Sequence, residues 1–426
     1  MDRAFQRLSI NERRIVVSID FGTTFSGLAW SETKRPDHQN VIENWPTASA
    51  KEGKSSPKVP TELRSVANGF QWGFQIPSSA KRNKYFKLRL DDPSGSTTDT
   101  KSPEELTRLY LSYLYTHMKY SLEKSLSAST VWSTPIDYVI TVPAIWTEAA
   151  KQKTLTAAEK AGFKSSKKTY LVSEPEAAAI YTLNNLRSST LGVQRSFVVC
   201  DAGGGTVDCI SYQIVKLSPR LTVKETTKGT GAKCGSSMLN KRFRRYIKQK
   251  FGEEYWADDD RLREAMDKFE QFKKDFTPQG EPLSLRIEMG TNAKLGVRRN
   301  RWTMDQSEME SKIFDPIIKD TIGLVKEQIS ATGNSVSAVL LVGGFGQSKY
   351  LKDRVKKALS SSVQVLQPSN GWTAVVQGAA MFGLRCVNEN YSKLHVTSRT
   401  ARKHYGVLLS MLFDPAKHNI TKRCET

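Results

Sequence analysis

Cysteine is scarce in this chain of 426 residues, and the few cysteines present are poorly spaced for cross-linking. The five cysteines are odd in number, lie far apart and include no Cys-x-x-Cys pair. This spacing disfavours both a disulfide framework and a zinc site. We therefore expect reduced thiols and an intracellular protein, located in the cytoplasm or the nucleus.

Long apolar runs are missing as well. No stretch approaches the ~20 consecutive apolar residues that a membrane-spanning helix requires, and the first residues lack the apolar core of a signal peptide. The chain is nevertheless long enough to bury a sizeable core. We expect a soluble globular protein that makes no contact with a membrane.

Acidic residues are outnumbered by basic ones. The chain has 64 Lys and Arg against 43 Asp and Glu, which gives a net charge of +21. Such a surface attracts anions of any kind in a salt-sensitive way, and its self-repulsion favours a monomer over a filament. The most basic predicted helix, residues 238–251, has no aromatic platform or groove-reading motif beside it, so a solvated face is favoured there over nucleic-acid binding.

What the chain does contain is a strand, an aspartate and a glycine turn within residues 197–208. The apolar residues predict a buried strand that ends at Asp201, and three glycines follow it. Glycines allow the backbone N–H groups to face an anion, and carboxylates at Asp201 and Asp208 are hard ligands for a metal-bound phosphate. The Thr206 hydroxyl can donate to a phosphate oxygen. Taken alone, three glycines more often mark an ordinary hairpin.

A second copy of this pattern strengthens the phosphate interpretation. Residues 16–27 again read as a strand that ends in an aspartate, Asp20, followed by a Gly/Thr turn. Two such units predict a duplicated scaffold in which two loops hold one phosphate chain and its metal from opposite sides. A third unit, residues 336–348, is a buried strand followed by a Gly-Gly-x-Gly turn, an arrangement that serves a nucleotide.

Glu174 is a fourth candidate carboxylate. It lies where a predicted strand passes into a helix over residues 177–183. A carboxylate at a strand end can orient a water molecule or hold the hydration shell of a metal. A glutamate stabilised by the helix dipole explains the local sequence equally well.

The lysines of two segments can be explained either by nucleotide binding or by an ordinary structural role. The predicted helix over 261–276 places Glu270, Lys273 and Lys274 on neighbouring faces, where an ion pair is the default expectation. Residues 80–90 are basic and alternate like a strand; one lysine there can reach a phosphate, but a solvated face is favoured for any single residue.

Five separated stretches together resemble the actin-like ATPase domain of the heat-shock protein 70 (DnaK-type) chaperone family. The stretches are residues 20–24, 140–162, 173–179, 201–208 and 341–348, and the likeness spans residues 15–384. The resemblance implies an α/β protein with the actin-like ATPase fold, in which two lobes of duplicated ribonuclease-H-like βαβ units surround a central nucleotide cleft. It also implies that ATP or ADP binds there together with Mg²⁺.

The same resemblance implies a division of the chain. Lobe I is expected over residues 13–195, lobe II over 196–371, a helix returning to lobe I over 372–387, and a basic tail over 388–426. The tail is too short for the family's peptide-binding domain. The sequence is thus similar to divergent fungal and animal members that lack a recognisable peptide-binding half, and a truncated gene model of such a member would give the same pattern.

Roles for individual residues follow from the resemblance, position by position. The expected metal ligands are Asp20, Asp201 and Asp208, and the expected catalytic residues are Asp201, Glu174, Asp208 and Thr206. The residues expected to hold the nucleotide are Gly22, Thr23, Thr24, Gly203, Gly204, Gly205, Glu270, Lys273, Lys274, Gly343, Gly344 and Gln347. Catalysis of this kind is mainly electrostatic, since donors and metal lie where charge develops on the transferred phosphoryl group.

The sequence departs from the family at several positions. The family has an arginine where Gln347 stands, so stacking of a guanidinium on adenine is lost. Its Pro-Asp-Glu element is replaced at residues 371–373, and Lys151 occupies the place of the relay arginine that partners Pro143.

The catalytic lysine of the family cannot be assigned to one position. Spacing from Asp20 favours Lys81, whereas the local run also allows Lys84 or Lys87. The three lysines therefore stay open as alternatives.

The leading functional hypothesis is an ATP-binding, slowly hydrolysing protein of the chaperone type, with protein clients or co-chaperones as partners. The alternative is a nucleotide-gated interaction module with little hydrolysis. A small-molecule kinase of the same superfold is a third hypothesis, although the Asn-Asp pair that such kinases often use was not found in the sequence.

Overall fold

The computed structural model describes most of the chain. The described residues are 13–91, 101–165, 169–185, 192–218, 220–333, 335–391, 394–401, 414 and 416–417. Parts of the predicted loop over residues 91–102 and most of the tail lie outside them. Within the described residues no helix combines the length and the apolar character needed to cross a bilayer.

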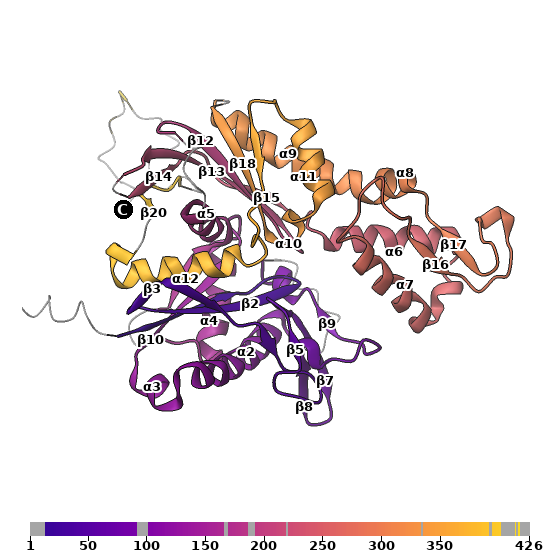
Figure 1. The fold of residues 1–426 in the computed structure, drawn as a ribbon, viewed down its shortest axis with the longest axis horizontal. Coiled ribbons are helices and arrows are strands. Elements are labelled where there is room, and N and C mark those ends of the chain that lie inside the picture. The colour runs from indigo at the N-terminus through magenta and orange to yellow at the C-terminus, as the bar shows by residue number, and fades with distance from the viewer. Residues whose placement is uncertain are drawn as a thin grey trace, which may run out of the picture.

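Two large sheets with the same strand pattern form the body of the molecule (Figure 1). The first sheet has the order β11 (Tyr170–Ser173), β10 (Ile136–Val142), β1 (Ile15–Asp20), β2 (Phe25–Glu32) and β3 (Arg35–Val41), and β6 (Val59–Pro60) pairs with β2. The second has the order β19 (Gln364–Leu366), β18 (Val336–Val342), β12 (Ser196–Ala202), β13 (Val207–Lys216), β14 (Leu221–Glu225) and β20 (Leu394–Val396), and β15 (Thr230–Ala232) pairs with β13.

The two sheets repeat one topology. In the first, β1 pairs antiparallel with β2 and parallel with β10, which pairs parallel with β11. In the second, β12 pairs antiparallel with β13 and parallel with β18, which pairs parallel with β19. The predicted duplication of the strand, aspartate and turn unit is therefore matched by a duplication of the sheet around it. We call the parts built on these sheets the first half and the second half.

Helices cover the outer faces of both sheets. In the first half these are α2 (Pro103–Leu126), α3 (Ala128–Ser133) and α4 (Glu148–Ala161), and in the second half α9 (Asp315–Ala331) and α11 (Lys349–Ala358). The helix α4 begins and ends as its sequence predicts, because the Thr147 hydroxyl accepts a hydrogen bond from the Ala150 N–H and Gly162 adopts the left-handed conformation.

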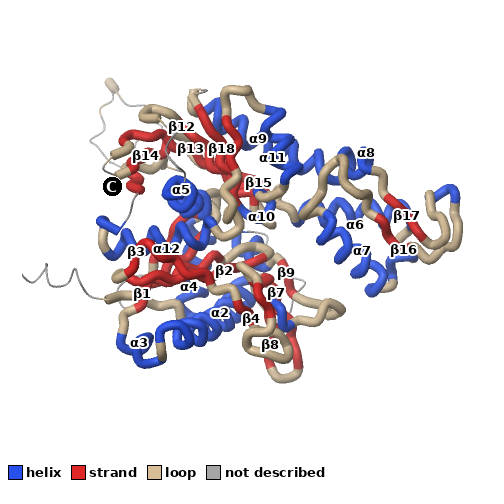
Figure 2. The backbone as a smooth tube through the Cα atoms, viewed as in Figure 1, coloured by secondary structure: helices blue, strands red, loops and turns tan. Residues whose placement is uncertain are grey.

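Two helices lie between the sheets, as Figure 2 shows. They are α5 (Glu174–Asn185) and α12 (Ala374–Val387), and they share a buried apolar cluster with both halves. The helices approach closely at Gly378, where an added Cβ would lie 1.7 Å from the Ala177 carbonyl oxygen. Gly383 of α12 packs in the same way against Val16 and Val139 of the first sheet. Small residues in α12 therefore connect the halves, in agreement with the close packing expected from its sequence.

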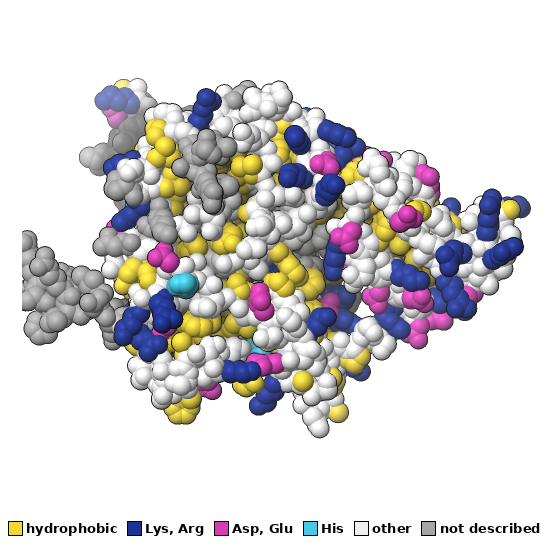
Figure 3. All heavy atoms as spheres, viewed as in Figure 1, with side chains coloured by type: hydrophobic (Ala, Val, Ile, Leu, Met, Phe, Trp, Pro, Cys, Tyr) yellow, Lys and Arg dark blue, Asp and Glu magenta, His cyan; other side chains and the backbone are white. Residues whose placement is uncertain are grey.

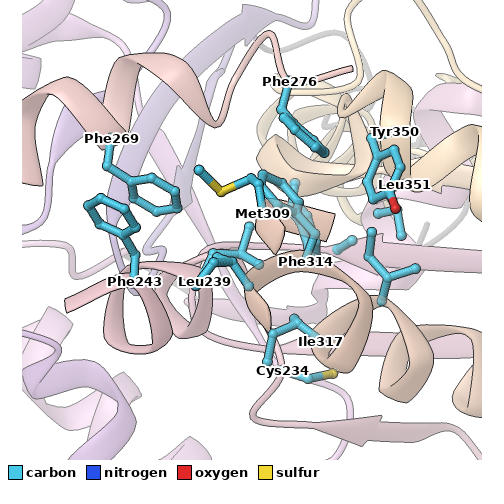
Figure 4. Close-up of a cluster of buried hydrophobic side chains, with 14 of the residues drawn as sticks. Cys234, Leu239, Phe243, Phe269, Phe276, Met309, Phe314, Ile317, Tyr350 and Leu351 are labelled. Carbon is cyan, nitrogen blue, oxygen red and sulfur yellow. The ribbon is translucent and has the colours of Figure 1, made fainter. Parts of the chain in front are cut away.

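A separate arm extends from the second half (Figure 1). It contains α6 (Ser237–Phe251), α7 (Asp259–Phe272), β16 (Ser284–Arg286), β17 (Arg301–Thr303) and α8 (Gln306–Glu308). Phe243 and Phe269 stack at 4.1 Å between ring centroids, and Phe276 stacks on Phe314 at 4.2 Å (Figure 4). Basic and acidic side chains are interspersed on the visible face of this arm (Figure 3). Ion pairs occur within the arm, such as that between Arg263 and Asp260 at 2.5 Å.

The segment over residues 80–90 differs from its predicted strand-like alternation. Only β9 (Asn83–Lys84) is a strand, and a 3₁₀ helix, η3 (Phe86–Asp91), follows. Tyr85 has a φ of 61°, so the left-handed conformation of this residue ends the strand. The small strands β4 (Asn44–Trp45), β5 (Lys54–Ser55), β7 (Glu62–Val66) and β8 (Gly69–Trp72) complete this edge of the first half.

The beginning of the tail contributes to the second sheet. Strand β20 pairs parallel with β14, and the Arg399 guanidinium then pairs with the buried Glu176 carboxylate at the start of α5. This part of the tail is thus attached to the body rather than extended from it.

Candidate functional site

The first loop follows β1, which ends at the buried Asp20. Gly22 lies inside the turn between β1 and β2, and an added Cβ there would lie 2.0 Å from the Phe25 carbonyl oxygen. Only glycine therefore fits this turn without displacing the backbone. Thr23 and Thr24 come next, at the tip of the loop.

The second loop joins β12 to β13 and is braced from behind. Within it, the Gly203 N–H donates to the Thr206 carbonyl oxygen at 2.9 Å. The N–H groups of residues 235–237 donate to the carbonyl oxygens of residues 203–205 at 2.8–3.2 Å. Since these carbonyls are held from one side, the orientation of the peptide groups in the loop is fixed.

The two loops meet. An added Cβ on Gly204 would lie 2.0 Å from the Thr24 hydroxyl oxygen, and one on Gly205 would lie 2.6 Å from that of Thr23. The threonines of the first half thus lie directly against the glycines of the second half. Asp20, the last residue of β1, and Asp201, the last residue but one of β12, lie close enough for the charge of Asp20 to raise the pKa of Asp201, as the repeated motif predicts. We call this junction of the two halves the cleft.

Carboxylates of both halves are buried behind these loops. Asp20, Glu174, Asp201 and Asp208 are each less than a tenth exposed. Burial raises the pKa of Glu174, although the ammonium of Lys87 opposes this shift. Burial and, after it, repulsion from Glu174, Asp20 and Asp208 raise the pKa of Asp201 well above its ordinary value. The four carboxylates therefore repel one another in an environment that is largely shielded from water.

Asp208 is the most extreme of these carboxylates. Neither of its buried oxygens has a hydrogen-bond partner of normal geometry. Burial, followed by repulsion from Glu174, raises its pKa to about 7, while the nearby Thr206 hydroxyl and the Ile145 backbone lower it. A buried carboxylate without a hydrogen bond of normal geometry is costly, so this position favours a cation closer than the Lys87 ammonium, which lowers the pKa of Asp208 only in part.

One of the three candidate lysines lies in the cleft. Lys87 is 1 % exposed, and its Nζ donates to Glu174 Oε1 at 2.6 Å. Lys84 pairs with Glu62 at 3.0 Å at the edge of β9, and Lys81 is exposed and lies 3.7 Å from Asp259. The geometry favours Lys87 over the other two, including the one that sequence spacing favoured.

A second lysine in the cleft was missed by the sequence analysis. Lys58 is 6 % exposed, and its Nζ donates to Asp20 Oδ2 at 2.5 Å. It stands alone between Pro57 and Val59, without a motif around it. Only the pairing of β6 with β2 brings this lysine to Asp20, and a lone lysine before a two-residue strand carries no local signal of that pairing.

The third unit closes the cleft behind Asp201. Gly343 has a φ of +81°, and an added Cβ there would lie 2.4 Å from Asp201 Oδ1. The turn after β18 forms a single helical turn, α10 (Gly343–Gly346), rather than an irregular loop. Trp372 lies over Gly344 and makes an edge contact with Phe25 of the first loop at 5.6 Å between ring centroids. The side-chain nitrogen of Gln347 is buried there without a partner.

The ion pair expected in the arm is present. Lys273 Nζ donates to Glu270 Oε2 at 2.7 Å and to Asn240 Oδ1 at 2.9 Å, and burial lowers the pKa of Lys273. Lys274 is exposed. Tyr85 of the first half lies near enough for Glu270 to contribute, after burial, to raising the Tyr85 pKa to about 12. Glu270 of the arm thus lies near Tyr85 of the first half, and the contact of Glu270, Lys273 and Lys274 with a nucleoside stays a prediction.

The relay positions also lie near the cleft. Pro143 is buried at the end of β10, two residues before Ile145, whose backbone faces Asp208. Lys151 pairs with Glu148 one helical turn earlier at 2.7 Å, on the surface of α4.

A magnesium ion fits this donor set in one particular way. In the described part of the chain, no group of three or more His, Cys, Asp or Glu is arranged to hold a metal by itself. Mg²⁺, however, keeps several waters and is commonly bound by one or two carboxylates together with phosphate oxygens. The oxygens of Asp208, which accept no hydrogen bond of normal geometry, suit that mode, in which phosphate oxygens would complete the site.

A surface groove of about 660 Å³ lies away from these residues. It is bounded by residues of β2, β3 and α2, among them Glu32, Arg35 and Lys124. It contains none of the predicted site residues.

Comparison with known proteins gives a family match and several relatives. The family model described as Hsp70 protein matches residues 74–390. Heat shock 70 kDa protein 12A of Mus musculus is 26% identical over 477 residues, covering 87% of this chain and 69% of the relative. Heat shock 70 kDa protein 12B of Homo sapiens is 25% identical, covering 98% and 74%. The Chaperone protein HscA homolog of Rickettsia peacockii (strain Rustic) is 26% identical, covering 87% and 56%.

Proposed function

Because the chain belongs to the Hsp70 family, which has the actin-like ATPase fold, we propose that it binds Mg-ATP between two lobes and hydrolyses it slowly as a chaperone-like protein. The first and second halves correspond to these lobes. The resemblance drawn from five stretches of sequence is confirmed by the family match.

One observation carries the proposal: the loops that follow Asp20 and Asp201 are in contact with each other. Thr23 and Thr24 lie against Gly205 and Gly204, and the carboxylates of both halves lie behind them. Loops that meet in this way present hydroxyl and backbone N–H donors to one anion from two sides. A phosphate chain is the ligand that matches these donors together with a metal.

The residues of the chain divide the work of hydrolysis between them. Lys87 neutralises Glu174, so a partly shielded carboxylate faces the cleft where an attacking water would be oriented. Thr206 provides a hydroxyl beside Asp208, and the peptide groups whose carbonyls are held provide the N–H groups of residues 204–206 as donors. Asp201 and Asp208 would hold magnesium, which supplies positive charge to the terminal phosphates when bound. No covalent intermediate is needed.

Phosphate release tests the proposal. At saturating Mg-ATP the parent should release phosphate slowly, and Asp208→Asn and Glu174→Gln should reduce that rate by about 100-fold or more, as loss of an electrostatic group at a reacting centre does. Asp353→Asn and Glu327→Gln, which change exposed acids of α11 and α9, are matched controls and should leave the rate unchanged.

Binding is measured separately from turnover. Ligand at ~100 times its dissociation constant stabilises the native state by roughly 2.7 kcal/mol, so Mg-ATP or Mg-ADP should raise the melting temperature of the folded parent. A parent that shows this shift but releases no phosphate acts as a nucleotide-gated interaction module instead. A parent that shows neither does not have the proposed function. The named relatives are heat shock and chaperone proteins, which gives no support to the kinase alternative.

Partners and location complete the proposal. Protein clients and co-chaperones are proposed from the chaperone relatives. A location in the cytoplasm or the nucleus is proposed from the free thiols, which the structure describes for Cys200, Cys209, Cys234 and Cys386.

A further inference from the structure

Asp20 differs from the other cleft aspartates because the chain itself occupies both of its oxygens. Lys58 Nζ donates to Oδ2 at 2.5 Å, and the Thr141 hydroxyl donates to Oδ1 at 3.3 Å. The side chains of the ion pair are 7% and 5% exposed. Asp208 pairs with no ammonium group among the described residues and accepts no hydrogen bond of normal geometry, although the Thr206 hydroxyl and the Ile145 backbone lie near it. The sequence predicts Asp20 and Asp208 to be equivalent metal ligands. In the structure, however, Asp20 is neutralised by an ammonium group and Asp208 is not.

The path of the Lys58 side chain is built into the first sheet. Its aliphatic carbons cross β2 at Gly27, where an added Cβ would lie only 3.2–3.6 Å from them. The Ser56 hydroxyl donates to the Lys58 carbonyl oxygen at 2.8 Å and holds the backbone. A surface lysine extends its ammonium into water. Here a glycine on the neighbouring strand lets the ammonium reach inward to the cleft.

The burial of this pair is not explained by stability. Removing two charges from water costs about as much as their attraction returns, and apolar replacements of buried pairs are often neutral or stabilising. A pair that contributes little to folding but lies behind the phosphate loop needs another role. The charge of Lys58 also acts on its neighbours, since it lowers the pKa of Asp201 and Glu174 against the effect of burial.

We propose, on the basis of the function proposed above, that Lys58 is a built-in cation of the phosphate site that removes Asp20 from the metal's ligands and offers an ammonium to the phosphates. The first half then supplies two ammonium groups, Lys58 and Lys87, each next to a carboxylate. The second half supplies Asp201 and Asp208, which no Lys or Arg of the described residues pairs with. The carboxylates of the second half would therefore hold the metal, and the two lysines would offer their ammonium groups to the phosphates.

Calorimetric titration with ADP, in Mg²⁺ and in EDTA, separates these roles without depending on turnover. Lys58→Met removes the charge and keeps the stem that packs on Gly27. Lys54→Met is the matched control, because it removes the same charge from an exposed position on the same segment. Asp20→Asn and Asp208→Asn are compared by the Mg²⁺ concentration at which ADP binding is half-maximally strengthened.

In EDTA, ADP should bind Lys58→Met about 10-fold or more weaker than the parent, which is the value of one charge-assisted hydrogen bond. Lys54→Met should stay within about 2-fold, as surface substitutions do. Asp208→Asn should raise the half-maximal Mg²⁺ concentration by about 10-fold or more, whereas Asp20→Asn should change it by no more than about 2-fold. Melting curves without nucleotide confirm that each variant is folded.

The double variant Lys58→Met/Asp20→Asn distinguishes loss of binding from loss of folding, because it leaves neither partner of the ion pair charged. It should melt near the parent temperature and still lose ADP affinity in EDTA. Equal effects of Asp20→Asn and Asp208→Asn on the Mg²⁺ requirement would overturn the inference, as would equal behaviour of Lys58→Met and Lys54→Met. A folded parent that binds no ADP in Mg²⁺ overturns the proposed function itself.

Discussion

The ionised Asp208 carboxylate is expected to lower the free energy of unfolding when no nucleotide is bound. Its carboxylate is buried without a hydrogen bond of normal geometry, and burial, followed by repulsion from Glu174, raises its pKa from the ordinary 3.8 to about 7. Between about pH 4 and pH 7, Asp208 is therefore protonated in the native state but ionised in the unfolded chain. The resulting stabilisation is fully present below about pH 4 and is lost as the pH rises through about 7, so at pH 8 the native protein carries an unfavourable charge.

Asp208→Asn should remove this penalty in the absence of nucleotide. A pKa shift of about three units corresponds to roughly 4 kcal/mol, and an amide left without partners costs about 1–3 kcal/mol of that gain. We expect a net stabilisation at pH 8 of about 1–3 kcal/mol, or a melting temperature higher by a few degrees. At pH 5 the parent is mostly protonated, and the advantage of the variant should disappear or reverse.

Thermal melts followed by circular dichroism between pH 5 and pH 8.5 check this expectation. Asp353→Asn, on the exposed face of α11, is the control for a change of net charge and should show no pH-dependent difference from the parent. The reasoning is refuted if Asp208→Asn melts below the parent by the same amount at both ends of the pH range. That result would mean that the Thr206 hydroxyl, the Lys87 ammonium and the Ile145 backbone stabilise the carboxylate in the native state by more than its burial destabilises it.

Four further single substitutions and one double variant test the fold. Burial lowers the pKa of His117 from 6.5, so the parent should lose stability as the pH falls below 6.5, and His117→Gln should melt with a smaller pH dependence between pH 7 and 5. Gly378→Ala forces a methyl group against a carbonyl of α5 and should cost about 2–3 kcal/mol in thermal unfolding, whereas Gly323→Ala, with nothing within 4 Å, should stabilise α9 by about 0.5–1 kcal/mol. Arg14→Met leaves the Asp137 carboxylate buried without its bidentate partner and should cost about 3–5 kcal/mol, which the added change Asp137→Asn should largely restore.

Strand and helix positions near the site could be predicted because their signals are local. The strand of residues 336–342 has the bounds that its apolar run predicts, and the Thr147 cap and Gly162 end of α4 are also as expected. The repeated strand and aspartate motif likewise predicted the duplicated sheet, since equal sequences of strand, turn and strand form equal hairpins. In each case a short stretch of sequence contains both the pattern and its consequence.

The lysines of the cleft could not be assigned because their positions depend on distant pairing. Lys87 enters the cleft because Tyr85 ends the strand at a positive φ and a 3₁₀ helix turns the next residues inward. Lys58 enters because β6 pairs with β2, which lies more than 30 positions earlier in the chain. Neither event has a periodic signal. Spacing from Asp20 consequently favoured Lys81, which is exposed.

The glycine run of the second loop shows why a local sequence supports two explanations at once. Gly203 closes a tight hairpin through its hydrogen bond to Thr206, which is the ordinary role of glycine in a turn. Gly204 and Gly205 have a different role, because any side chain there would collide with Thr24 and Thr23 of the other half. These two glycines therefore set the distance between the halves. An isolated turn would tolerate larger residues at these two positions, whereas a site formed between two loops does not. The two cases can be distinguished only by the first loop, which lies some 180 residues earlier in the chain.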